Sequence, residues 1–136
     1  MSTKVDQFSD KLRDRLDKIE GRIHSFKTNI HDLPEQAERD LRQKLDDAHA
    51  KVEAQKNKVE QTRANLKARA NEAVTETEET ISGWKAKHEV KKLNARADRA
   101  ESYAADAIDF AVAAIDEAEE AVLEAAVARI DADAVQ

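Results

Sequence analysis

Apolar side chains recur at helical spacing along almost the whole chain, and charged residues separate them. In the first segment, residues 3–31, the apolar positions step alternately by four and three residues from Leu12 onward. They are Leu12, Leu16, Ile19, Ile23, Phe26, Ile30 and Leu33. This repeat is the heptad pattern of a coiled coil. The segment is therefore predicted to form an amphipathic helix with one continuous apolar seam.

The stretch HDLPEQ marks the first break between predicted helices. Pro34 suits the first turn of a new helix, where its missing N–H group is not needed. Glu35 and Glu38 favour the positive end of that helix's dipole. A second helix is predicted over residues 35–81. Its apolar seam is narrow and includes Gln55 and Thr62, so this helix needs partner helices to stabilise it.

The second break is predicted at Ser82-Gly83. After Ile81 the apolar pattern slips by two residues, which matches neither of the usual coiled-coil insertions. Gly83 is the glycine closest to this slip. We expect a tight turn there and a third helix over residues 84–130, with one continuous helix as the alternative. The third helix carries a wide apolar arc, which either the first helix or a second chain covers; it comprises Phe110, Val112, Leu123 and Val127.

The three seams can be aligned as two antiparallel hairpins. With turns at the two predicted breaks, Leu41 of the second helix faces Phe26 of the first and Val122 of the third. Heptad seams can also be aligned one heptad apart, so the support for this register comes from its agreement with the two breaks.

The fold class that follows is all-α: an elongated antiparallel three-helix coiled-coil bundle, forming a single domain over residues 1–136. Because the first helix is the shortest, residues 63–100 form a two-helix stalk. The stalk seam is mostly alanine, and such a thin core is rarely stable alone. We therefore expect a homodimer to complete it. The candidate oligomer contacts are Leu66, Ala70, Ala73, Trp84, Val90, Leu93 and Ala97.

The composition agrees with this fold. Charged residues make up 38% and aromatic residues 4% of the 136 residues, as is typical of coiled coils and long helices. Large apolar side chains are too few for the thick core of a compact globule. The chain has no cysteine, which excludes disulfide bonds and thiolate metal sites.

The charge distribution is uneven. Residues 98–136 hold 2 basic and 11 acidic side chains, whereas residues 1–97 hold 21 basic and 18 acidic ones. The densest acidic row is Asp106, Asp109, Asp116, Glu117, Glu120 and Glu124. We expect this row to form salt bridges with basic flanks of the same chain, with cation binding as the alternative. The net charge of −6 argues against a nucleic-acid partner, which needs a dense basic surface.

No arrangement of residues predicts catalysis or a cofactor. Two histidines stand at chelating distances from acidic residues, His24 after Glu20 and His49 after Asp46. However, the Glu-x-x-His motif of di-iron bundles is missing. A thin helical rod also seldom offers a concave pocket. We expect a non-enzyme without catalytic, cofactor or metal residues.

Three functional classes fit these observations. The first is a structural or adaptor coiled coil that acts through self-association and an unidentified protein partner. The second is an amphipathic protein that coats lipid or hydrophobic granules. In composition alone, the chain resembles exchangeable apolipoproteins and granule-coating phasins. The alanine-rich, acid-flanked apolar face makes this class less favourable.

The third class is a stress-related helical protein, which the low aromatic content and high charge would suit. The sequence MSTKVDQFSD lacks the apolar core of a signal peptide, and no apolar run approaches the roughly 20 residues of a membrane helix. A cytoplasmic location is therefore expected.

Overall fold

The structure is a computed structural model that describes residues 3–73 and 76–136 of the chain. The described part contains four α-helices and one short 3-10 helix, with no strand. The elements are α1 (Thr3–Asp32), η1 (Leu33–Glu35), α2 (Glu38–Ala73), α3 (Glu78–Ala86) and α4 (Val90–Ala134). The prediction of an all-α helical bundle is confirmed.

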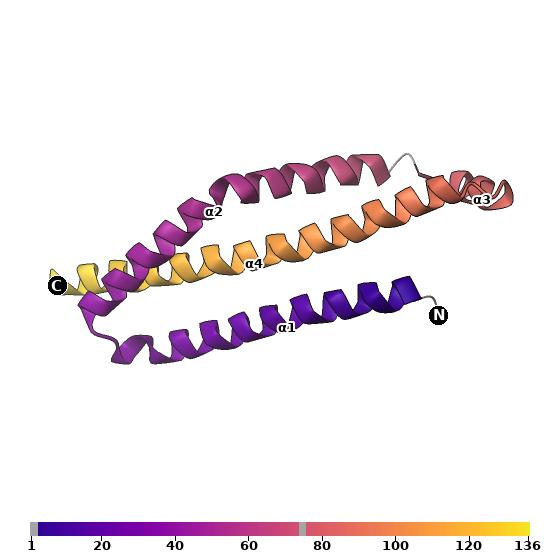
Figure 1. Ribbon diagram of the computed structural model, residues 1–136. Helices are drawn as coiled ribbons and strands as arrows, with labels where there is room; N and C mark the ends of the chain where they lie inside the picture. Colours follow the sequence, from indigo (N-terminus) through magenta and orange to yellow (C-terminus); the bar gives the residue numbers. More distant parts are fainter. Residues whose placement is uncertain (1–2, 74–75) are drawn as a thin grey trace.

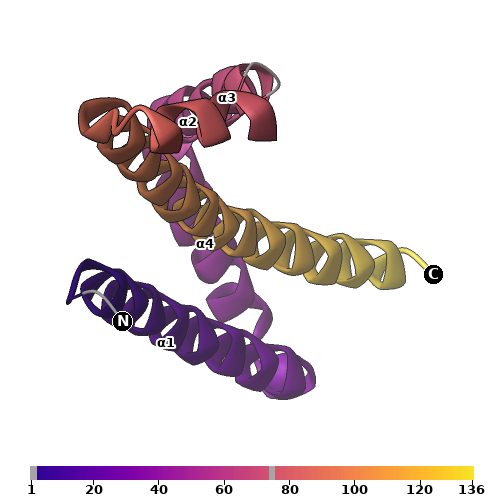
Figure 2. The ribbon, with the colours of Figure 1, turned by 90° about the vertical axis from the view of Figure 1, so that its right-hand side faces the viewer.

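Helix α4 is the central element of this bundle (Figures 1 and 2). Helix α2 runs antiparallel to α4 on one side, and α1 runs parallel to α4 on the other. The contact between α2 and α4 is extensive, whereas α1 touches α4 more sparsely and makes little backbone contact with α2. The pairing of Phe26 with Leu41 that the sequence predicted is therefore wrong. Helix α1 packs on α4 instead.

The first connection lies where the sequence predicted it but is longer. Helix α1 continues through Asp32, and Pro34 lies in the 3-10 turn η1. The backbone N–H of Gln36 donates to the carbonyl of Leu33 over 3.2 Å, so the chain makes a full turn before α2 begins at Glu38. Proline provides this stop because it has no N–H group and restricts the residue before it.

The second connection corrects the prediction of a turn at Ser82-Gly83. Both residues lie inside α3, whose first turn is capped by the Thr77 side chain, which accepts from the Thr80 N–H over 3.2 Å. The chain reverses instead at His88, which has a φ of 53°.

The reversal at His88 has the hydrogen bonds of a Schellman C-cap. The N–H of Glu89 donates to the Trp84 carbonyl over 2.8 Å, and the N–H of His88 donates to the Lys85 carbonyl over 3.2 Å. A glycine usually occupies this left-handed position. Because a histidine takes it here, the composition of the turn gave no signal.

The later turn shifts the register between α2 and α4. Lys51 pairs with Asp116, and Arg42 pairs with Asp131. Both partners lie further along α4 than the predicted register places them, Asp116 by four residues and Asp131 by ten. The predicted pairing of Leu41 with Val122 is displaced with them. The cause is that the hairpin turns at residues 87–89 rather than at Ser82-Gly83.

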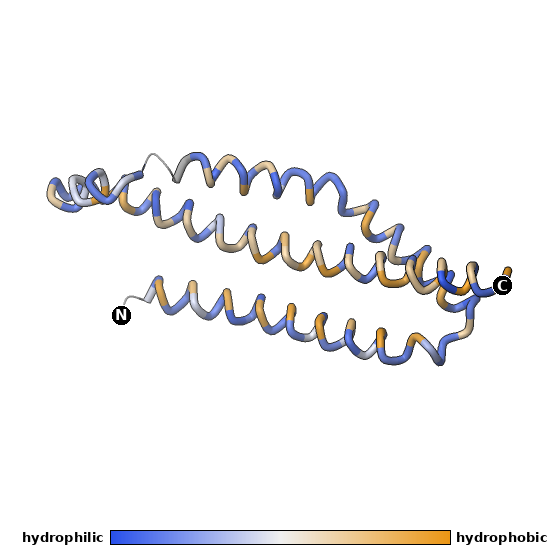
Figure 3. The backbone as a smooth tube through the Cα atoms, turned by 180° about the vertical axis from the view of Figure 1, so that it is seen from behind, coloured by the Kyte–Doolittle hydropathy of each residue, from blue (hydrophilic) through white to orange (hydrophobic). Residues whose placement is uncertain are grey.

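The core of the bundle is thin. Among the described residues, the buried apolar side chains are Leu41, Ala113 and Val127, all on α2 and α4. Helix α1 contributes none, although hydrophobic positions recur along its whole length (Figure 3). The remaining members of the apolar arc, Phe110, Val112 and Leu123, are only half-buried. The intrachain packing therefore covers α4 only in part.

Candidate functional site

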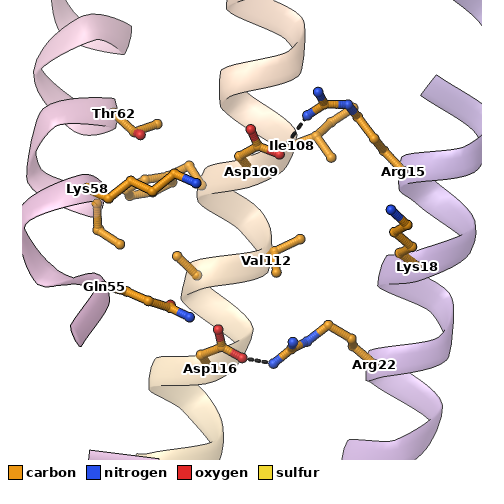
Figure 4. Close-up of a pocket in the computed structure, with 13 residues that line it drawn as sticks. Arg15, Lys18, Arg22, Gln55, Lys58, Thr62, Ile108, Asp109, Val112 and Asp116 are labelled. Atoms are coloured by element: carbon orange, nitrogen blue, oxygen red, sulfur yellow. Dashed lines mark hydrogen bonds and ion pairs between the residues drawn. The ribbon is translucent and has the colours of Figure 1, made fainter. Parts of the chain in front are cut away.

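An open groove lies between α1, α2 and α4, with a volume of 540 Å³ (Figure 4). Its apolar wall comes from α4, with Ile108 and Val112. Its rims carry cations: Lys58 projects from α2, and Arg15 and Lys18 project from α1. This groove is larger than two other grooves of 320 Å³ each in the described part of the chain, and we treat it as the candidate site.

Asp116 is the most deeply buried charged side chain of the groove. Its side chain is 2% exposed. It pairs with the guanidinium of Arg22 on α1 and with the Lys51 ammonium group on α2, whose Nζ lies 3.2 Å from Oδ1. A buried carboxylate needs such partners to offset its desolvation. One carboxylate on α4 therefore joins all three long helices.

A second ion pair repeats this contact one heptad earlier. The Arg15 Nη1 atom lies 2.7 Å from Asp109 Oδ1, and the same atom donates to the Ala105 carbonyl over 3.4 Å. Arg15 and Arg22 are seven residues apart on α1, as Asp109 and Asp116 are on α4. Such matched spacing is what parallel helices require, and it holds α1 against α4.

His49 and Glu120 link α2 and α4 on the exposed surface. The His49 Nδ1 atom lies 3.0 Å from Glu120 Oε1. This hydrogen bond raises the pKa of His49 above its ordinary value of 6.5, and the nearby Glu120, Glu53 and Asp46 charges raise it further. The expected salt-bridged acidic flank is thus present at Asp109, Asp116 and Glu120.

The predicted oligomer contacts lie around the far end of the bundle, where α3 packs on α4. Leu66, Trp84 and Leu93 are half-buried, whereas Ala70, Val90 and Ala97 are exposed. Ala73 ends α2, and its side chain lies outside the described residues. A smaller groove of 320 Å³ also lies here, where Glu76 pairs with Arg99. Contact of these residues with a second chain remains a prediction.

The sequence did not predict the groove, because the predicted register places the first helix against the second. The usable signal was the matched seven-residue spacing of Arg15 and Arg22 with Asp109 and Asp116. Heptad seams alone could not supply it, since they do not distinguish α2 from α4 as the partner of α1.

Two further findings limit the chemistry of this surface. Within the described residues, no group of three or more histidine, aspartate or glutamate side chains is placed to hold a metal ion. None of the described helices combines the length and apolar character that crossing a membrane requires.

No protein-family model, curated protein or solved structure matches the chain. The function is therefore inferred from the fold, the groove and the exposed helix faces.

Proposed function

We propose that the protein is an elongated helical scaffold that acts through self-association and protein–protein interaction. The observation that carries this proposal is the incomplete burial of α1. Four of its large aliphatic side chains are 43–49% exposed; they are Val5, Leu16, Ile23 and Ile30. Long polar helices gain most of their stability from packing an amphipathic face. A bundle that leaves this face half open is suited to binding another helix.

We also propose that the protein is a scaffold rather than an enzyme. In the groove, Asp109 and Asp116 are both held in ion pairs with arginines. These two ion pairs join α1 to α4, so both carboxylates already have a structural role in helix packing. The groove is open to solvent, whereas catalytic pockets enclose most of a substrate. We keep the cytoplasm as the proposed location, which suits a chain without cysteine.

Sedimentation velocity over a concentration series tests self-association, because it measures mass and elongation together. We expect a dimer whose population rises with protein concentration. If the protein stays monomeric at every concentration up to about 100 μM, its self-association is too weak for a scaffold of this kind. The variants Leu66→Asp and Leu93→Asp then test the stalk contact that the sequence predicted: dissociation of the dimer by these variants would support that contact.

A second candidate function is the coating of a lipid or granule surface. The half-open apolar face of α1 favours it, because α1 could leave α4 and lie on an interface. Flotation with neutral and anionic vesicles tests this function. A protein that is monomeric in solution and floats with vesicles would replace the scaffold by the coating function. Circular dichroism in plain buffer tests the third candidate, a stress-related protein that folds only on drying or binding: a helical spectrum rejects it.

A further inference from the structure

Helix α1 has two adjoining faces with different surroundings. One face lies against α4 through Arg15 and Arg22, next to the half-buried residues Leu12, Ile19 and Phe26. The adjoining face, which we call the free face, carries three of the half-exposed aliphatic residues, Leu16, Ile23 and Ile30. In heptad notation, the face against α4 consists of d and g positions: Leu12, Ile19 and Phe26 are d positions, and Arg15 and Arg22 are g positions. The apolar residues of the free face are the a positions Leu16, Ile23 and Ile30.

A row of charges borders the free face at the e positions. Asp6, Arg13, Glu20 and Lys27 are spaced seven residues apart, and their charges alternate in sign. All four side chains are exposed. None of them forms an ion pair within the part of the chain that the structure describes. The charge row is therefore free to meet a partner.

We propose that α1 pairs antiparallel with α1 of a second copy of this chain. When two copies of this row run antiparallel, each charge lies opposite a charge of the other sign. Asp6 meets Lys27 of the second copy, and Arg13 meets Glu20. Two-fold symmetry forms each of these contacts twice. In antiparallel coiled coils, e positions face e positions of the partner helix, which is the geometry this row needs.

The apolar positions fit the same alignment. Leu16 lies level with Ile19 of the second copy, Ile23 with Leu12, and Ile30 with Val5. Each half-exposed aliphatic residue thus meets another seam residue. Along the helix axis, the alignment of the apolar layers differs from that of the charge pairs by about two residues, or roughly 3 Å. Long charged side chains span this offset easily.

A parallel pairing does not fit. It would place the e row of one α1 against the g row of the other. That g row includes Arg15 and Arg22, which α4 of the same chain already holds. The antiparallel arrangement leaves both arginine contacts with α4 intact. Its apolar layers join the free face of one copy to the d positions Leu12 and Ile19 of the other, which are only half-buried against α4.

This inference rests on the self-association in the proposed function and names its contact surface as α1 rather than the stalk. The central test uses Arg13→Glu and Glu20→Arg, each of which places like charges opposite each other at two symmetric sites. We expect the dimer dissociation constant of each variant to rise by about tenfold. The double variant Arg13→Glu/Glu20→Arg restores opposite pairing, so its dissociation constant returns to within about threefold of wild type.

A mixture of the two single variants provides the sharpest result. A chain with Arg13→Glu presents two acids at these positions, and a chain with Glu20→Arg presents two bases. Mixed together, they should form a heterodimer at concentrations where each alone is monomeric. Asp14→Arg, an exposed change on the outer side of α1, is the matched control and should leave the dissociation constant unchanged. Circular dichroism confirms that each variant keeps its helix content.

The absence of cysteine allows an orientation test with a short thiol cross-linker. We prepare Asp6→Cys and Lys27→Cys as single-cysteine chains. In the antiparallel dimer, identical positions lie roughly 30 Å or more apart, so covalent dimers form only when the two chains are mixed. Cross-linking of either chain with itself would overturn the antiparallel pairing.

The outcomes separate this inference from the proposed function. A wild-type chain that stays monomeric would overturn both. A second outcome is that the wild type is a dimer, that Leu66→Asp dissociates it, and that Arg13→Glu and the mixed variants leave it unchanged. This outcome would overturn the α1 contact but not the scaffold function.

Discussion

The three-helix junction at Asp116 gives a prediction whose magnitude follows from the structure. The Asp116 side chain is 2% exposed, while Arg22 is 30% and Lys51 46% exposed. Arg22→Met keeps most of the aliphatic stem and removes the guanidinium. The Asp116 carboxylate then stays buried with Lys51 as its one remaining cation at 3.2 Å.

We expect this change to lower the free energy of unfolding by about 2 kcal/mol. A polar group left short of a partner costs about 1–3 kcal/mol, and breaking a fully buried ion pair costs about 3–5 kcal/mol. The lower range applies because Arg22 is partly solvated and Lys51 remains. With a urea slope of about 2 kcal/mol/M, the unfolding midpoint should fall by about 1 M.

Urea unfolding followed by far-UV circular dichroism, at one fixed protein concentration, measures this effect. Lys18→Met is the matched control, since Lys18 lines the same groove on α1 but forms no ion pair in the described part of the chain; we expect a change below about 0.5 kcal/mol. The double variant Arg22→Met/Asp116→Leu should regain most of the stability, because no charge remains buried. If Arg22→Met unfolds like Lys18→Met, Asp116 does not depend on Arg22 and the reasoning is refuted.

Three further changes test the connections and the surface. His88→Gly should stabilise the protein by about 1 kcal/mol in urea, because glycine adopts the left-handed turn without strain; a loss would contradict the assigned C-cap. Thr77→Ala should cost about 1 kcal/mol by removing the cap of α3, and Thr77→Ser should restore it. Because Glu120 raises the pKa of His49 in the folded protein, this contact stabilises fully below the ordinary value of 6.5 and is lost as the pH rises through the raised pKa. Between about pH 6 and pH 8, wild type should therefore lose more urea resistance than His49→Gln, and equal losses would contradict the contact.

The sequence was sufficient for the first helix but not for the region between α2 and α4. The helix predicted over residues 35–81 ends at Ala73, a separate helix α3 follows at Glu78–Ala86, and α4 begins at Val90 rather than at residue 84. The heptad steps from Leu12 to Leu33 predicted the first helix at residues 3–31, against Thr3–Asp32 in the structure. The turn was misplaced because Gly83 was treated as a breaker. In the structure Gly83 is helical, and a Cβ atom there would meet nothing within 4 Å. The chain reverses at His88, where only the backbone hydrogen bonds reveal the cap.

The placement of α1 could not be predicted from apolar positions alone. The d positions of its seam face α4, but the same seam would also have fitted α2, because heptad seams are interchangeable partners. Charges carried the missing information. Arg15 and Arg22 match Asp109 and Asp116 in spacing, and Asp6, Arg13, Glu20 and Lys27 have no partner within the described part of the chain; a wider comparison of charge spacings would have found both.

The central claim is that a second copy of the chain completes this thin bundle through α1. Sedimentation velocity of wild type beside Leu16→Asp tests it most directly, since Leu16 is 49% exposed and its replacement costs the single chain little. The claim predicts a wild-type dimer and a Leu16→Asp monomer with the same helix content. A monomeric wild type, or a variant that remains dimeric, would contradict it.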